Sequence, residues 1–261
     1  PSFVESCREA GLEAVPALAD FYKQWVEQEK ATKAPALELP QLKEAVNSGL
    51  MYELFGKYNP NPQEPAIPQE LLEEAAAHRN IDDLILDEEA GTVYYADPEL
   101  QLDVGSIGKG YAVEQVCRAA PDGLLLSVGG NVRATGPKPG GENWVVGIQA
   151  PGGESGAFLH TLYVRDVSVV TSGDYQRYYT VGGVRYHHII DPTTCRPAAY
   201  WRAVTVLCAD SGLADALSTA LFTLPQAEGQ ALLDRYGAEA MWVDASGGEV
   251  FSPGFSAYLR T

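Results

Sequence analysis

The chain has 261 residues, of which 18 are basic and 35 acidic, and its formal net charge at pH 7 is −17. This charge argues against nucleic-acid binding, because binding along phosphates requires clustered Lys and Arg. It also repels anionic membrane surfaces, and we find no run of 18 apolar residues that predicts a membrane-spanning helix. A phosphate compound as ligand therefore needs a metal ion or a local positive site to offset the net charge.

Four cysteines lie far apart in the sequence, at Cys7, Cys117, Cys195 and Cys208. They form no CxxC pair and no spacing typical of a zinc site or a disulfide framework. We therefore interpret them as isolated structural thiols.

The first third of the chain is predicted to be helical and polar. Apolar residues at intervals of three and four indicate one face of a helix; they are Leu18, Phe21, Tyr22, Trp25 and Val26. A Pro-rich connector over 59–65 cannot be crossed by a helix. A second helix is expected over Pro68–His78, with Pro68 near its first turn.

From Ile81 the pattern becomes typical of β-structure. Leu84–Leu86 and Thr92–Tyr95 flank an acidic turn and predict a hairpin. Further strands are expected over Leu124–Val128, Trp144–Gln149, Leu159–Val164, Val167–Thr171, Tyr175–Val181, Val184–Ile190, Ala203–Cys208 and Ala240–Val243. Helices are expected over Lys109–Ala119, Leu213–Leu224 and Ala227–Tyr236. Strand runs mixed with a few helices indicate an α+β protein without regular βαβ alternation.

A glycine-rich turn over Asp103–Val113 is the first candidate functional segment. Such a turn between a strand and a helix exposes backbone N–H groups and attracts anions. Lys109 falls in the first helical turn, where the helix dipole disfavours a cation, and this suggests a bound anion. The glycines match neither a Walker A loop nor a GxGxxG fingerprint. A tight turn with a solvated lysine explains the segment equally well.

Two later segments carry weaker signals. Two glycines in Ser127–Asn131 permit close backbone approach to a ligand, although a β-bulge is the preferred interpretation of this motif alone. His187 and His188 are adjacent, so in a strand they face opposite sides and cannot ligate one metal together. We expect one to be interior and one exposed, and a single His is more often structural. Asp191–Pro192 begins a turn.

Asp215 and Thr219 form the fourth signal, because four residues separate them and they share one helix face. Both offer hard oxygen ligands, which suit Mg²⁺. In isolation, the preferred interpretation is a helix N-terminal Asp followed by a buried Thr that bonds to its own turn.

Taken in order, these segments resemble the ApbE family of flavin transferases (FAD:protein FMN transferases). The resemblance covers about residues 40–225 and depends on the order and spacing of the matching stretches. These are Asp103–Val113, Ser127–Asn131, Trp144–Pro151, Thr171–Tyr175, His187–Pro192 and Ala214–Leu221.

The resemblance implies a two-lobed α+β protein that holds FAD in the cleft between its lobes. It implies a single domain over 1–261, with residues 1–40 divergent or incomplete. The implied enzyme is a transferase that uses Mg²⁺ to move the FMN moiety of FAD to a Thr or Ser hydroxyl of an acceptor flavoprotein, releasing AMP. Family members commonly act on the extracytoplasmic face of a bacterial membrane, often as lipoproteins, so this location is also implied.

The resemblance also assigns roles to single residues. FAD contacts fall on Asp103, Lys109, the backbone around Ile190, and the stretch Ala45, Val46 and Asn47. Metal ligands fall on the Ser106 carbonyl and the side chains of Asp215 and Thr219. His188 is the candidate acid/base group, and Asp215 is the second catalytic residue. An ordinary imidazole pKa near ~6.5 would let His188 accept the hydroxyl proton at neutral pH.

Two positions depart from the family pattern. Ala45-Val46-Asn47 stands where the family usually has Ala-Phe-Asp, and Cys195 stands where it usually has Gly. A Gly at such a turn often has a positive φ, which Cys adopts only with strain. Asn47 and Cys195 favour an alternative, an FAD-binding protein without transferase activity. A metal-dependent FAD pyrophosphatase giving FMN and AMP would use the same site with water as the nucleophile.

Overall fold

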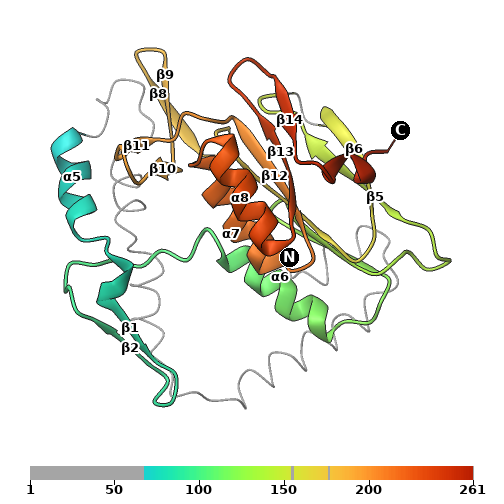
Figure 1. The fold of residues 1–261 in the computed structure, drawn as a ribbon, viewed down its shortest axis with the longest axis horizontal. Coiled ribbons are helices and arrows are strands. Elements are labelled where there is room, and N and C mark those ends of the chain that lie inside the picture. Colours follow the sequence, from blue (N-terminus) through green and yellow to red (C-terminus); the bar gives the residue numbers. More distant parts are fainter. Residues whose placement is uncertain (1–67, 154–155, 176, 261) are drawn as a thin grey trace, which may run out of the picture. The chain divides into compact units, whose positions relative to one another are not determined.

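The computed structural model describes residues 68–153, 156–175 and 177–260. The chain divides into two compact units, which we describe separately (Figure 1). Among the described residues, Ile81–Pro98 belong to the first unit, and 68–80 together with the residues from Glu99 onward belong to the second. The predicted helix face at 18–26 and the connector at 59–65 lie outside the described residues.

The described part of the first unit is a short 3-10 helix followed by a hairpin. The helix η1 spans Ile81–Asp83, and strands β1 (Leu84–Asp87) and β2 (Thr92–Tyr95) pair antiparallel, with Leu84 opposite Tyr95. The hairpin predicted from sequence is confirmed.

The second unit is built on a six-stranded antiparallel sheet in the order β14-β13-β12-β7-β4-β3. In chain order its strands are β3 (Leu124–Val128), β4 (Asn131–Thr135), β7 (Ser168–Gly173), β12 (Ala203–Cys208), β13 (Glu239–Val243) and β14 (Glu249–Phe251). All six residues of the central strand β12 are buried, because both faces of the sheet are covered.

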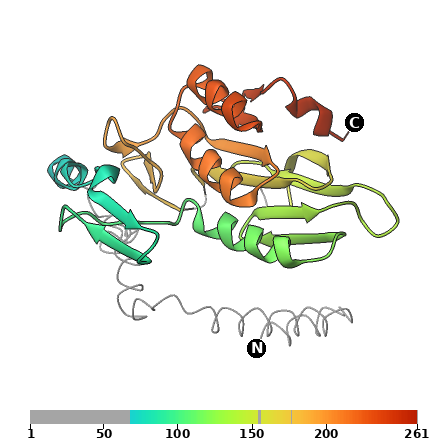
Figure 2. The same ribbon diagram turned by 60° about the horizontal axis from the view of Figure 1, so that its bottom comes forward.

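Helices α6 (Gly108–Ala119), α7 (Ser211–Phe222) and α8 (Gln226–Tyr236) lie on one side of this sheet, and α6 and α7 run next to each other (Figure 2). Val204 and Val206 of β12 join one core cluster with α7 and α8. The helix α7 begins two residues before the predicted Leu213, because the Asp210 carboxylate caps it by accepting the Leu213 N–H at 2.8 Å.

The opposite face of the sheet packs against a second hairpin. Its strands are β5 (Trp144–Gln149) and β6 (Phe158–Val164), and the C-terminal 3-10 helix η2 (Phe255–Tyr258) completes this layer. Ala203 and Leu207 of β12 belong to this second cluster, so the strand alternates between the two cores with a period of two residues.

Several short elements complete the second unit. Helix α5 spans Gln69–Ala77 and begins directly after Pro68, as the sequence predicted. The remaining strands form two-stranded ribbons, β8 (Tyr178–Val181) with β9 (Val184–His187), and β10 (Ile190–Asp191) with β11 (Arg196–Pro197).

The α+β fold class is confirmed, and the errors concern individual strands. The predicted strand Val184–Ile190 is two strands, because the β8–β9 ladder ends at His187. The predicted strand Tyr175–Val181 begins only at Tyr178, and β4, β11 and β14 were not predicted. The preferred β-bulge in Ser127–Asn131 is wrong. Gly129 and Gly130, with φ of 55° and 87°, form a two-residue turn between the paired residues Val128 and Asn131.

Within the described part of the chain, no helix is both long and apolar enough to cross a membrane. Cys117, Cys195 and Cys208 are free thiols, as expected, and Cys7 lies outside the described residues. The two-lobed arrangement with a ligand cleft stays a prediction.

Candidate active site

The turn before α6 is shaped by Asp103. Its Oδ1 accepts the Gly105 N–H at 2.7 Å, and the Gly108 N–H donates to the Val104 carbonyl at 2.7 Å, so the chain turns directly into the helix. Ser106 is exposed in this turn. The N-cap residue Ile107 provides no side-chain cap, so the first N–H groups of α6 depend on other partners.

Asp215 of α7 supplies that missing cap. Its Oδ2 accepts the Gly110 N–H at 2.8 Å, and the residue is only 3% exposed. A Cβ at position 110 would overlap the Ser211 carbonyl oxygen, so only glycine lets the two helices approach this closely. A buried carboxylate at a helix N-terminus is also favoured by the helix dipole.

Lys109 forms an ion pair with the same carboxylate. Its Nζ lies 3.3 and 3.4 Å from the two Asp215 oxygens and 3.5 Å from the Gly105 carbonyl oxygen. The lysine that the helix dipole disfavours therefore has an anionic partner inside the chain itself, so no external anion is required to explain its position. Because its side chain is 43% exposed, the ammonium remains accessible to a ligand.

Thr219 lies one turn after Asp215, as the spacing predicted. Its Oγ1 is 3.5 Å from the Asp215 carbonyl oxygen and 3.4 Å from the Ser172 hydroxyl. Both distances are at the long limit for a hydrogen bond between these groups, so the Thr219 hydroxyl forms only a weak hydrogen bond to its own helical turn. Ser172 bonds instead to Ser218, at 2.8 Å.

The donor set around Asp215 suits a hard divalent ion. The described residues contain no cluster of three or more His, Cys, Asp or Glu that could hold a metal. A metal here would therefore use one carboxylate, one hydroxyl and backbone carbonyls, a sparse oxygen set of the kind that Mg²⁺ accepts. The Lys109 ammonium already lies among such oxygens, so this position accommodates a positive charge.

A cavity of about 260 Å³ lies beside the Asp103 turn, within the second unit. It is lined by Leu72, Ala75, Ala76, His78, Arg79, Glu99, Gln101, Asp103, Ile190, Pro192 and Cys195. A guanidinium N–H of Arg79 donates to the Pro192 carbonyl and so links the end of α5 to the turn after β10. The cavity thus joins Asp103 and Ile190, two residues predicted to contact FAD.

His187 is a structural histidine. It is 5% exposed and its ring packs edge-on against Phe222, with 5.6 Å between the ring centroids. Its Nε2 lies 2.9 Å from the Ala198 carbonyl oxygen, which only accepts, so Nε2 carries the hydrogen. Its Nδ1 then accepts the Ile189 N–H at 3.3 Å. Burial lowers the pKa of His187, consistent with this neutral tautomer.

His188 follows the end of β9 and is partly exposed. Its Nδ1 lies 3.3 Å from the Arg177 carbonyl oxygen and must donate to it, which leaves the Nε2 lone pair available in the neutral form. Burial is the main cause that lowers the pKa of His188; the hydrogen bond to the Arg177 carbonyl opposes this, and the charge of Arg177 lowers the pKa further.

The structure thus brings Lys109 and Asp215 together with Thr219, and joins Asp103 to Ile190 at the cavity. Ala45, Val46 and Asn47, predicted to contact the flavin, lie outside the described residues. Sequence reasoning missed the cavity-lining residues of α5 and a buried carboxylate on α6, Glu114. The only available signal was a glutamate on the apolar side of a helix, four residues after Gly110.

We call the contact between the starts of α6 and α7 the junction. The fold and this junction define an α+β protein in which Lys109 and the buried Asp215 carboxylate meet at the N-terminus of α6, after the Asp103 turn that lines the cavity. The ApbE family model matches residues 43–242, and the chain belongs to the ApbE family.

The curated relatives are FAD:protein FMN transferases. That of Treponema pallidum (strain Nichols) is 39% identical over 166 residues, which cover 58% of this chain and 46% of the relative. That of Escherichia coli (strain K12) is 30% identical over 226 residues, which cover 82% of this chain and 64% of the relative. The chain therefore spans only about half to two thirds of the length of these relatives.

Solved structures of the family share the fold. The ApbE protein of Thermotoga maritima superimposes with a TM-score of 0.74 at 32% identity, covering 83% of this chain and 72% of that one. The apo flavinyl transferase ApbE of Pseudomonas stutzeri gives a TM-score of 0.62 at 32% identity, covering 74% and 62%. The resemblance identified from sequence is thereby confirmed.

Proposed function

We propose that the chain transfers the FMN moiety of FAD to a Thr or Ser hydroxyl of an acceptor flavoprotein, with Mg²⁺ as cofactor and AMP as the second product. The observation that carries this proposal is the Lys109–Asp215 pair at the N-terminus of α6, in a chain of the ApbE family. The curated relatives, which are FAD:protein FMN transferases, support the transfer of FMN from FAD to a protein.

FAD binding is assigned to the Asp103 turn and the cavity beside it. At about 260 Å³, the cavity is smaller than the roughly 300–1,000 Å³ typical of sites for drug-sized ligands, so it accepts one ring system and not the whole dinucleotide. Its apolar wall from α5 suits the face of a ring, and Asp103 and the backbone of Ile190 offer polar contacts at the edge.

The pyrophosphate of FAD is repelled by a chain with a net charge of −17 and requires a local positive field. The Lys109 ammonium and the N-terminal end of α6 supply such a field. Asp215 and Thr219, together with the Ser106 carbonyl, are the residues that would hold Mg²⁺. When bound, Mg²⁺ would polarise the phosphoryl oxygens and neutralise charge on the departing AMP.

We assign His188 as the general base that takes the proton from the hydroxyl of the acceptor protein. In the transfer, the hydroxyl oxygen forms a bond to the phosphorus of the FMN moiety, and the bond from that phosphorus to the bridging oxygen breaks, so AMP leaves with that oxygen. The hydroxyl proton passes to the free Nε2 of His188. A depressed pKa keeps this nitrogen unprotonated at neutral pH, which is the state a general base requires.

One incubation tests the proposal against its two alternatives. The protein is mixed with FAD, Mg²⁺ and a candidate acceptor domain, and both covalent flavin fluorescence on a denaturing gel and AMP release are measured. Transfer gives a fluorescent acceptor band and AMP. AMP without the band indicates an FAD pyrophosphatase, and neither signal despite FAD binding indicates a binding protein.

We also propose a location on the extracytoplasmic face of a bacterial membrane, with a lipid anchor, as family resemblance implies. Protease treatment of intact spheroplasts that produce the full-length protein tests this, since an extracytoplasmic protein is digested and a cytoplasmic marker is not.

A further inference from the structure

The starts of α6 and α7 cap each other. The Gly110 N–H of α6 donates to Asp215 Oδ2 of α7 at 2.8 Å, and the Ser211 N–H of α7 donates to Glu114 Oε2 of α6 at 2.8 Å. On each helix the donor and the carboxylate are four residues apart, which is one turn. The two bonds therefore form a reciprocal pair that joins one turn of α6 to one turn of α7.

Close packing leaves this pair little freedom. A Cβ at Gly110 would overlap the Ser211 carbonyl oxygen, and a Cβ at Gly212 would lie 3.4 Å from the Tyr111 Cα. The helices therefore meet backbone to backbone. A shift of one helix along the other would lengthen both capping bonds at once.

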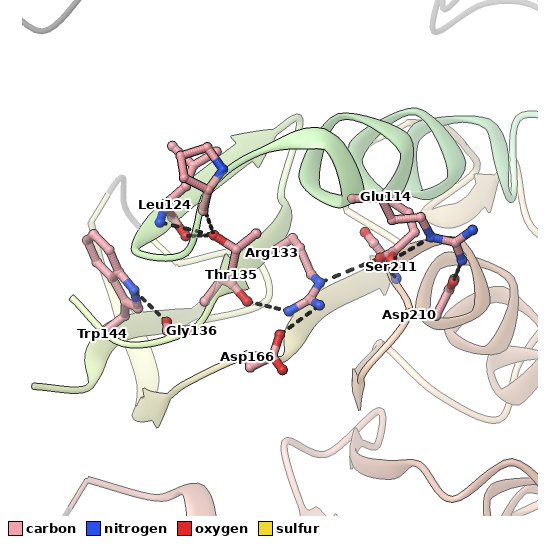
Figure 3. A network of polar contacts seen from close by, with 12 residues as sticks. Glu114, Leu124, Arg133, Thr135, Gly136, Trp144, Asp166, Asp210 and Ser211 are labelled. Carbon is pink, nitrogen blue, oxygen red and sulfur yellow. Dashed lines mark hydrogen bonds and ion pairs between the residues drawn. The ribbon is translucent and has the colours of Figure 1, made fainter. Parts of the chain in front are cut away.

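Glu114 is held from several sides. It is 6% exposed, and its carboxylate lies 3.2 Å from Arg118 Nε and 3.5 Å from Arg133 Nε. Figure 3 shows the Arg133 side chain between Glu114 on one side and Asp166 on the other, with 2.9 Å between Arg133 Nη2 and the Asp166 carboxylate. The carboxylate is thus tied to β4 as well as to α7.

Burying a carboxylate is costly, and an apolar side chain of similar volume often stabilises a packed helix pair at least as well. Glu114 adds a directional interaction: its carboxylate oxygen must face the Ser211 N–H, and this hydrogen bond restricts how α7 is placed along α6. Ser211 is fixed by a second bond, as its hydroxyl donates to Asn131 Oδ1 at 2.6 Å. The first residue of α7 is therefore held by a carboxylate of α6 and an amide of β4.

We propose that Glu114 is a positioning residue: by capping Ser211 it fixes α7 against α6 and so holds the Asp215 carboxylate at Gly110 and Lys109. The structural half of this inference concerns only the helix pair. The catalytic half rests on the proposed function, because it requires Asp215 and Lys109 to serve FAD cleavage.

Two matched pairs of variants test it in the full chain. Glu114→Gln keeps an oxygen acceptor of the same reach, and Glu114→Met removes it at similar length. Ser211→Pro removes the donor N–H at the first helical position and places its ring Cδ against the Glu114 oxygen, so it breaks the cap from the α7 side. Asp210 already has the extended backbone that precedes Pro (φ −96°, ψ 127°). Ser211→Ala is its control, because it loses the hydroxyl but keeps the N–H.

Amide hydrogen exchange by NMR is the first readout, with kcat and KM for FAD cleavage as the second. Glu114→Met and Ser211→Pro should each lower the protection of the Gly110 amide by about tenfold or more, while the central amides of α6 stay protected. The same two variants should lower kcat by about tenfold or more with little change in KM, because alignment is lost and not binding. Glu114→Gln should recover both quantities to within about threefold. Both Ser211 variants lose the hydroxyl bond to Asn131, so the comparison between them isolates the N–H, and Ser211→Ala should keep clearly higher Gly110 protection and kcat than Ser211→Pro.

An unchanged Gly110 amide in folded Glu114→Met or Ser211→Pro overturns the coupling between the two caps. Lower protection with an unchanged kcat overturns the positioning role. If Glu114→Met does not fold, the two Ser211 variants decide both points. If the parent chain cleaves no FAD while the exchange pattern appears as expected, the proposed function has failed and the reciprocal capping has not.

Discussion

The junction of α6 and α7 and the segment from Tyr178 to Pro197 differ in where their polar groups point. At the junction, Glu114 and Asp215 are buried and each accepts a backbone N–H at 2.8 Å. In the segment, His188 is partly exposed and Cys195 has a left-handed φ of 52° beside the cavity. The junction fixes its charges by burial, and the segment presents groups toward the cavity and solvent, which is a common division of roles.

Removing the Asp215 carboxylate from the junction should give the largest effect. Asp215→Ala is expected to abolish Mg²⁺-dependent FAD cleavage, because it removes the proposed metal ligand and leaves Lys109 without its partner. Asp215→Asn keeps an acceptor for the Gly110 N–H and should melt closer to the parent temperature, yet remain inactive. AMP release is measured over a Mg²⁺ titration. Full activity of either variant at limiting Mg²⁺ would place the metal site elsewhere.

The two adjacent histidines test the segment from Tyr178 to Pro197. His188→Ala should reduce FMN transfer by about 10²–10⁴-fold with FAD binding largely retained, the usual range for losing a general base. His187→Ala should affect the rate far less but lower the melting temperature, because it opens a cavity against Phe222. A loss of less than about tenfold in His188→Ala would remove this residue from the mechanism.

The pH profile sharpens the same test. Burial and then nearby positive charges lower the pKa of His188, so its base form persists below the ordinary value of about 6.5. The midpoint of the acid limb of the kcat/KM profile should therefore lie below that pH in the parent. The limb should disappear in His188→Ala. An acid limb that stays unchanged in His188→Ala belongs to another group.

Lys109, the cation of the junction, should give an intermediate effect. Lys109→Ala is expected to weaken FAD binding by about 1–3 kcal/mol, the scale of one charge-assisted hydrogen bond. Flavin fluorescence titration at matched salt measures this, and Lys109→Arg is a control that keeps the charge. Unchanged affinity in Lys109→Ala would limit the lysine to its ion pair with Asp215.

Local sequence patterns predicted most of the second unit. A nearly continuous apolar run predicted the strand Ala203–Cys208, and the glycine-rich turn located the start of α6 within one residue. The pattern failed at β4, where Asn131–Thr135 carries polar side chains that are buried by tertiary contacts. Arg133 in this strand is paired with Asp166, a partner 33 residues away that no local pattern reveals.

For the candidate site, spacing along one helix was sufficient to group Asp215 with Thr219. It could not show that Asp215 caps a different helix, because the Gly110 bond joins residues 105 positions apart. The same limitation hid Glu114, whose partner Ser211 is 97 positions away. The polar network of the junction is a property of packing, whereas the glycines that permit it were visible in the sequence.

The smallest expected effect concerns backbone strain at the cavity. Cys195 has φ +52°, in the region that glycine adopts without penalty, and it closes a turn in which its N–H donates to the Asp191 carbonyl at 2.9 Å. Cys195→Gly removes roughly 1–2 kcal/mol of backbone strain from the folded state. Glycine also increases the conformational entropy of the unfolded chain, which offsets part of this stabilisation. A net gain of about 0.5–1 kcal/mol is therefore expected, seen as a rise of roughly 1–4 °C in melting temperature for a chain of this size. Cys195→Ala retains the Cβ and should give no such gain. Equal stabilisation by both variants would trace the effect to the thiol, and the turn would then carry no strain of the kind that distinguishes this segment from the helix junction.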